Sequence, residues 1–72
     1  RYIQVGAFGR RSNAEGAQAR LRQAGLPVDQ RVIDRNGAKL TLVMAGPFSD
    51  IGALRNAWVA AHGIGFTDAF VK

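Results

Sequence analysis

Apolar and polar residues alternate along the first positions of the chain. Ile3 and Val5 flank Gln4, so in an extended segment the two apolar side chains share one face and Gln4 points to the other. This period of two predicts a strand over residues 1–8. Gly6 interrupts the alternation, and the pattern then takes a longer period.

The next segment has the period of an amphipathic helix. Small and aliphatic residues recur at helical spacing at Ala14, Ala17, Leu21 and Ala24. Ser12 and Glu15 precede most of this run at the spacing of a capping box, and Gly25 suits the C-terminal end. The pattern predicts a helix that begins near Ser12 and ends at Gly25.

The middle of the chain predicts a β-hairpin. Leu26, Val28 and Val32 favour a second strand, and residues 39–45 favour a third. Between them, Asn36-Gly37 suits a two-residue turn, because both residues tolerate the positive φ angles that such a turn requires. The dipeptide at 46–47, Gly-Pro, then predicts the end of the third strand.

A second helix and a last strand are predicted from residue 49 onward. Ser49 and Asp50 suit the start of this helix, and Gly63 suits its end. Its predicted core face carries Leu54, Trp58 and Ala61. Residues 66–72 predict a fourth strand. We also expect Phe8 and Phe48 to pack beneath the two strand-to-helix corners.

The two halves of the chain resemble each other weakly. Phe8 precedes Gly25 in the first half much as Phe48 precedes Gly63 in the second. With the element order β-α-β-β-α-β, this predicts an α+β fold of the ferredoxin-like type, a two-layer sandwich. Two helices are expected to cover one face of a four-stranded antiparallel sheet. The other face stays open and forms a rigid surface suited to binding.

Length and composition narrow the classes of function. The chain has 72 residues and no cysteine, so we expect one small domain, residues 1–72, without disulfides. It begins with Arg rather than Met, and we expect it to belong to a longer protein. One histidine and scattered carboxylates offer no catalytic residue, metal site or cofactor site, so we expect a non-enzymatic binding module. No apolar run approaches the ~20 residues of a membrane span.

The balance of charges favours an anionic partner. Ten Lys and Arg residues against five Asp and Glu residues give a net charge of +5, and eight of the ten are Arg. Nucleic acid, acidic lipid and the carboxylates of peptidoglycan all fit this charge, which does not choose between them.

Two short motifs resemble those of a known family. The sequence of residues 2–8 is Tyr-Ile-Gln-Val-Gly-Ala-Phe, followed by Asn13-Ala14-Glu15, and that of residues 45–48 is Ala-Gly-Pro-Phe. These motifs, their spacing and the element order resemble a SPOR domain, the sporulation-related repeat of bacterial cell-division and cell-wall proteins. The end of the first helix and the closing strand are also similar, so the resemblance covers essentially the whole chain.

This resemblance implies a function without catalysis or a cofactor. The implied partner is the peptidoglycan glycan strand that amidases have stripped of stem peptides, which is enriched at the division septum. The resemblance also implies a position at the C-terminal, periplasmic end of an anchored bacterial protein, which the domain targets to the septal cell wall. Division proteins are further implied partners of the full-length parent. Neither nucleic acid nor a membrane span in this segment is implied.

The resemblance and the strand pattern together select candidate ligand-binding residues. The resemblance places a ligand-binding glutamine at Gln4, and an amide both donates and accepts hydrogen bonds, as an N-acetyl group does. Tyr2 and Gly6 are predicted on the same open face, and Phe70 faces outward on the last strand. Asn13 is predicted in a loop where the family often makes polar contacts. A purely structural role is the alternative at each position.

The third strand gives two conflicting predictions. Its more apolar side, with Leu40, Leu42 and Met44, is the core by pattern alone, but the register of the Gly-Pro-Phe motif turns it to the open face. We follow the motif, so Leu40 and Leu42 become ligand-contact candidates in an exposed apolar patch with Tyr2, Met44 and Phe70. Many relatives carry arginine at the position of Leu42. The cations left to supply that charge are Arg10, Arg11, Arg35 and Lys39.

Three other functions share this architecture. An apolar open face also suits protein–protein interaction or self-association. An RNA-recognition motif requires spaced aromatic residues on its third strand, and residues 39–44 contain none. An acylphosphatase-type enzyme requires a phosphate loop that this sequence does not display. Protein binding through the open face is therefore the main alternative to glycan binding.

Overall fold

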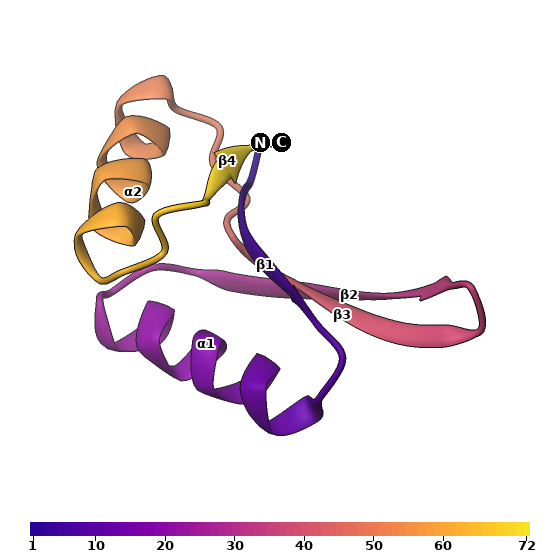
Figure 1. Ribbon diagram of the computed structural model, residues 1–72. Coiled ribbons are helices and arrows are strands. Elements are labelled where there is room, and N and C mark those ends of the chain that lie inside the picture. Colours follow the sequence, from indigo (N-terminus) through magenta and orange to yellow (C-terminus); the bar gives the residue numbers. More distant parts are fainter.

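The computed structural model describes residues 1–72. Its elements follow one another as predicted (Figure 1): β1 (Ile3–Phe8), α1 (Arg11–Gln23), β2 (Val28–Arg35), β3 (Ala38–Ala45), α2 (Ile51–Gly63) and β4 (Phe70–Val71). The four strands form one antiparallel sheet in the order β2-β3-β1-β4. The predicted α+β, β-α-β-β-α-β fold is confirmed. Neither helix is long and apolar enough to cross a bilayer.

The core lies between the helices and the two central strands. Ile3 and Val5 of β1 and Val43 and Ala45 of β3 supply the sheet side of this core. The helices pack on them through one apolar stripe each, made of Ala14, Ala17 and Leu21 on α1 and Leu54, Ala57 and Ala61 on α2. The register that the Gly-Pro-Phe motif predicts for β3 is therefore confirmed.

A β-bulge in β1 changes the alternation predicted for that strand. Between Gln4 and Gly6 the pairing with β3 slips by one residue, which puts Gly6 on the helix side. A Cβ atom at Gly6 would lie 2.8 Å from Cζ of Phe8, whose ring packs on the core. The prediction that Gly6 faces the open side is wrong, because its backbone leaves room for this ring. The prediction that Phe8 packs beneath the corner is confirmed.

The start of α1 differs from the sequence prediction. The helix begins at Arg11, and its N-cap, Arg10, makes no side-chain capping hydrogen bond. Ser12 lies inside the first turn, so the predicted capping box with Glu15 is wrong. The two residues keep the right spacing, but the helix begins two residues too early for Ser12 to stand at the cap.

The end of α1 is set by Gly25. This glycine has a φ of +82°, and the N–H of Leu26 donates to the carbonyl of Leu21 at 3.1 Å. The N–H of Gly25 itself donates to the carbonyl of Arg22 at 2.9 Å. These two bonds make a Schellman motif, which satisfies carbonyls that the helix end would otherwise leave without partners.

The same motif ends α2, but at Gly65. Asp50 caps the start of the helix as predicted, accepting from the N–H of Gly52 at 3.1 Å. Gly63, predicted to end it, is still helical, whereas Gly65 has a φ of +106° and the N–H of Phe66 donates to the carbonyl of Ala61 at 3.0 Å. The internal repeat is thus closer than the sequence suggests.

The two halves of the core are related by one constant offset. Gly65 follows Phe48 by as many residues as Gly25 follows Phe8. Each core residue of the second half also follows its counterpart in the first half by as many positions as Phe48 follows Phe8. The pairs are Ile3 and Val43, Ala14 and Leu54, Ala17 and Ala57, and Leu21 and Ala61. Phe48 packs against the core at the second corner as Phe8 does at the first, as predicted.

The last strand is much shorter than predicted. Only Phe70 and Val71 form β4. Residues 66–69 make a turn instead, in which the N–H of Ala69 donates to the carbonyl of Phe66 at 3.1 Å. This turn allows both Phe66 and Ala69 to pack with the core. The pairing is extended beyond β4 by reciprocal backbone bonds between Tyr2 and Lys72, so the two chain ends lie side by side (Figure 1).

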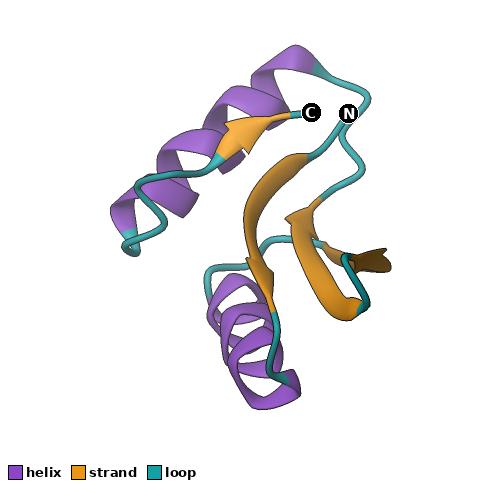
Figure 2. Ribbon diagram, turned by 45° about the vertical axis from the view of Figure 1, so that its right-hand side comes forward, coloured by secondary structure: helices purple, strands orange, loops and turns teal.

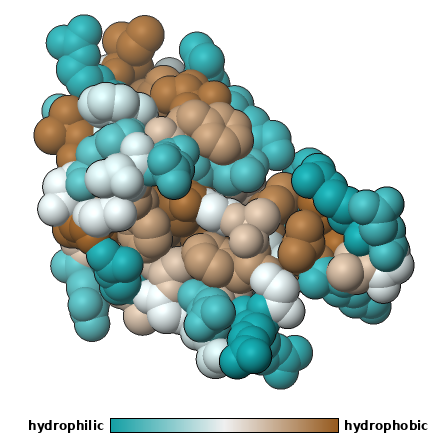
Figure 3. All heavy atoms as spheres, viewed as in Figure 1, coloured by the Kyte–Doolittle hydropathy of each residue, from teal (hydrophilic) through white to brown (hydrophobic).

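The β2–β3 hairpin extends beyond the helices, at the right of Figure 1. Asn36 and Gly37 have φ angles of +53° and +81°, so the predicted tight turn is confirmed. Figure 3 shows that hydrophilic residues gather over this end of the molecule. Charged edges of this kind discourage one sheet from adding to another.

Trp58 is not a core residue. The helix face that packs on the sheet carries Leu54, Ala57 and Ala61, and Trp58 lies on its flank with 41% of its surface exposed. Its ring lies over that of His62, with 3.9 Å between the centroids. The sequence prediction is wrong because a residue four positions after Leu54 can lie either on the helix face that packs on the sheet or on the flank beside that face. Figure 3 shows hydrophobic residues at the surface over α2.

Candidate ligand-binding face

One face of the sheet has no helix packed on it, and we name it the open face. Both helices lie on the opposite side (Figure 2). Alternation and strand pairing place the side chains of this face. They are Gln4 and Ala7 on β1, Phe70 on β4, Leu40, Leu42 and Met44 on β3, and Asp29, Arg31, Ile33 and Arg35 on β2.

The apolar part of the open face is largely buried. Leu42 and Met44 are only 7% and 5% exposed, and Leu40 and Tyr2 are half-buried. Because no other layer covers this face, their neighbours within the sheet must cover them. Of the large apolar side chains on this face, only Phe70 is broadly exposed, at 50%. The prediction of a wide exposed apolar patch is therefore wrong, although its members share the predicted face.

Gln4 lies on a central strand of this face and makes one side-chain hydrogen bond there. Its Cα is paired with Met44 on one side and with Phe70 on the other. The Nζ of Lys72 donates a hydrogen bond to its Oε1 at 3.1 Å. The outward placement of Gln4 and Phe70 is as predicted. The sequence prediction missed Lys72, although this residue follows Phe70 by two positions and so shares its face.

A cation on β2 occupies the neighbourhood of the missing arginine. Arg31 is paired directly with Leu42, the position at which the resemblance described above implies an arginine on β3. Residues paired across antiparallel strands have Cβ atoms about 5 Å apart, so the guanidinium of Arg31 reaches the same region. The sequence alone does not reveal this, because it requires the register between β2 and β3.

The other candidate cations are distributed over both sides of the sheet. Arg35 is on the open face near the hairpin turn. Lys39 and Arg11 lie on the helix side, where they line a polar hollow of about 560 Å³ between α1 and the hairpin. Arg10 is the exposed N-cap of α1. Arg35 is thus the only one of the four predicted cations that the strand register places on the open face.

Asn13 is separated from the other candidates. It lies in the first turn of α1 rather than in a loop, so that part of the prediction is wrong. Its side of the helix lines a hollow with Phe8 and Phe66, which pack on the helix side of the sheet. A ligand on the open face does not reach it.

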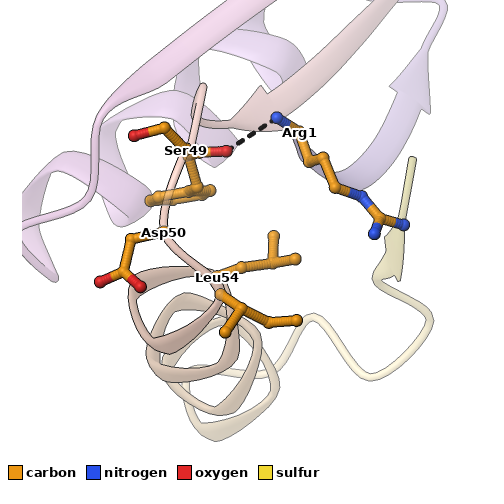
Figure 4. Close-up of a pocket in the computed structure, with 6 residues that line it drawn as sticks. Arg1, Ser49, Asp50 and Leu54 are labelled. Atoms are coloured by element: carbon orange, nitrogen blue, oxygen red, sulfur yellow. Dashed lines mark hydrogen bonds between the residues drawn. The ribbon is translucent and has the colours of Figure 1, made fainter.

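A further hollow, of about 350 Å³, lies at the start of α2 (Figure 4). Arg1, Ser49, Asp50 and Leu54 line it, and the backbone nitrogen of Arg1 donates to the carbonyl of Phe48 at 2.8 Å. The carboxylate of Asp50 is engaged with the N–H of Gly52. These contacts join the N-terminal segment to the second corner. No three His, Asp or Glu side chains come together anywhere in the chain.

Comparison with known proteins identifies this arrangement. The family model for the SPOR domain matches residues 1–72. The chain belongs to the SPOR domain family. SPOR domains are extracytoplasmic, cell-wall-binding domains of bacteria that bind peptidoglycan, and the family is one of binding modules.

A solved SPOR domain has the same fold. The crystal structure of the RlpA SPOR domain from Pseudomonas aeruginosa matches with a TM-score of 0.82 and 27% sequence identity. The match covers 90% of this chain and 87% of that one. No curated protein matches the sequence significantly. The structural match supports the element order and sheet topology of this SPOR domain across nearly its full length.

Proposed function

We propose that this SPOR domain binds peptidoglycan glycan strands stripped of stem peptides, and that it does so through the open face. The observation that carries the proposal is the placement of Gln4, which is central on the uncovered side of the sheet and lies between Met44 and Phe70. In this proposal the domain is a septal, periplasmic targeting module, C-terminal in a longer envelope protein that works alongside division proteins.

The chemistry of the open face fits an amino-sugar polymer. Phe70 and Tyr2 offer aromatic surface to the C–H faces of sugar rings. Gln4 offers an amide to N-acetyl groups. Arg31 offers a guanidinium to the carboxylate of muramic acid, a pairing that is often bidentate. Three kinds of group on one glycan thus have partners on one face.

The shape of the face favours strands without stem peptides. Leu42 and Met44 keep little exposed surface between their neighbours, so a ligand that contacts them has to approach the sheet closely. A peptide branching from the sugar would hold the strand away from the sheet. Selection by such exclusion requires no contact with the peptide itself.

The test is a pull-down with purified peptidoglycan sacculi before and after amidase treatment. We expect binding to rise after treatment and to fall about tenfold or more in Gln4→Ala, which corresponds to about 1.4 kcal/mol. Gln23→Ala is the matched control, because Gln23 is exposed at the end of α1. Equal binding to sacculi before and after amidase treatment would contradict the preference for strands without stem peptides.

Protein binding through the open face remains the alternative outcome of this test. Its support in the sequence is a broad apolar patch, and the burial of Leu42 and Met44 removes most of that area. If the folded domain binds neither preparation of sacculi, the glycan proposal fails. The remaining exposed apolar residue of the face, Phe70, would then be the first place to look for a protein contact.

A further inference from the structure

The contact between Lys72 and Gln4 fixes the orientation of the Gln4 amide. An ammonium group donates hydrogen bonds and accepts none. The group that meets Nζ of Lys72 at 3.1 Å is therefore the amide oxygen, Oε1. The opposite orientation would place the amide NH₂ against the ammonium, donor against donor. With its oxygen engaged, Gln4 turns its NH₂ group away from Lys72.

The other long polar side chains on this part of the open face are donors as well. Arg31 beside Leu42 carries only N–H groups, and the ammonium of Lys72 keeps donors beyond the one that Gln4 accepts. The nearest acceptor is the carboxylate of Asp29 on β2, of which Oδ1 accepts from the N–H of Gln30 at 2.8 Å, so three donor side chains stand beside one carboxylate. The centre of the face thus presents mainly hydrogen-bond donors.

We propose that Lys72 is a positioning residue that makes Gln4 a dedicated donor, so that the site recognises an acyl carbonyl, the oxygen of an acetamido group. This rests on the proposed function and adds which chemical group of the glycan is recognised. An undirected glutamine would offer donor or acceptor equally. Held by Lys72, Gln4 discriminates between an acetamido group, whose carbonyl oxygen accepts, and an amino group, which has no carbonyl oxygen and in its protonated form only donates.

The test compares binding to stem-peptide-free glycan strands in their N-acetylated form and after chemical N-deacetylation. We expect wild type to bind the acetylated strands at least about tenfold more tightly. In Lys72→Met, which keeps the length of the side chain and removes the donor, this ratio should fall at least about threefold. Chemical re-acetylation of the deacetylated strands should restore the tight binding of the wild-type domain.

Lys39→Met is the matched control for charge. Lys39 lies on the helix side of the sheet, so the substitution removes the same charge from the domain without touching the open face. We expect it to keep the wild-type ratio, whereas simple repulsion between deacetylated glycan and a basic protein would change the ratio equally in both variants. Circular dichroism confirms that each variant is folded.

The inference and the proposed function fail in different ways. If wild type binds acetylated and deacetylated strands equally, or if Lys72→Met keeps the full ratio, glycan binding stands and the role of Lys72 is overturned. If wild type binds neither, the proposed function itself is wrong.

Discussion

At the scale of single residues, the side chain of one residue often takes the space or supplies the charge that another position lacks. Gly6 has no side chain because the Phe8 ring occupies its place. Arg31 stands beside Leu42 and supplies a guanidinium that the third strand lacks. The first case depends on the bulge in β1 and the second on the register between β2 and β3, and the sequence pattern reveals neither.

The surroundings of Gly6 and Gly16 predict opposite effects of substitution by alanine on the stability of the domain. Gly6→Ala places a methyl group against the Phe8 ring and should destabilise the domain by about 1–3 kcal/mol. Gly16→Ala, in the interior of α1 with open space around it, should stabilise by about 0.5–1 kcal/mol. Urea unfolding followed by circular dichroism measures both.

A second variant separates packing from backbone effects at Gly6. Combining Gly6→Ala with Phe8→Leu removes the ring from the site of the clash, so the double variant should lose less stability than the two single variants together. Strict additivity would mean that the bulge backbone, and not the ring, requires glycine.

At the scale of elements, the sequence predicted the order and the type of the helices and strands well, but it predicted their end points poorly. Helix and strand periods are repeated over several residues, so the core stripes were placed correctly except for Trp58. The end of an element depends on one or two residues and on the packing of the segment after it. Phe66 and Thr67 favour a strand, but Asp68 and Ala69 do not, and residues 66–69 form a turn in which Phe66 packs against the core.

The paired helix ends provide a test at this scale. Gly65 has a φ of +106°, so Gly65→Ala should destabilise the domain by about 1–3 kcal/mol. Gly63, two residues earlier, is helical with nothing near its Cβ position, so Gly63→Ala should be neutral or stabilising by up to about 1 kcal/mol. Thermal unfolding of the two variants in parallel checks this, and a larger loss at Gly63 would contradict the Schellman end.

The same distinction applies to the candidate site. Gln4, Leu40, Leu42 and Phe70 could be placed on the open face from the alternation of short strands and from one motif. The low exposure of Leu42 could not be predicted from the sequence, because it depends on side chains of the neighbouring strands. The spacing from Phe70 places Lys72 on that face, but its contact with Gln4 required knowledge of where β4 is paired, and the position of Asn13 required knowledge of where α1 begins.

At the scale of the whole molecule, the sheet is uneven in strength. The hairpin strands β2 and β3 are paired over eight positions each, whereas β4 contributes two residues at the opposite edge. The edge that carries Phe70 and Lys72 is thus held by few backbone hydrogen bonds. Local opening of such an edge costs less than unfolding of the centre.

The adjacent ends of the chain give this unevenness a mechanical meaning. Tyr2 and Lys72 are paired in antiparallel register, so a load applied between the two ends would open the β1–β4 hydrogen bonds one after another, as in a zipper. We expect optical-tweezers traces to show β4 detaching at a lower force than the rest of the sheet. A single rupture of the whole domain would contradict this.

Detachment of β4 would carry Phe70 and Lys72 away from Gln4. In an experiment that pulls the domain by its two ends, it should therefore release a bound glycan before it unfolds, and bind it again when the tension is released.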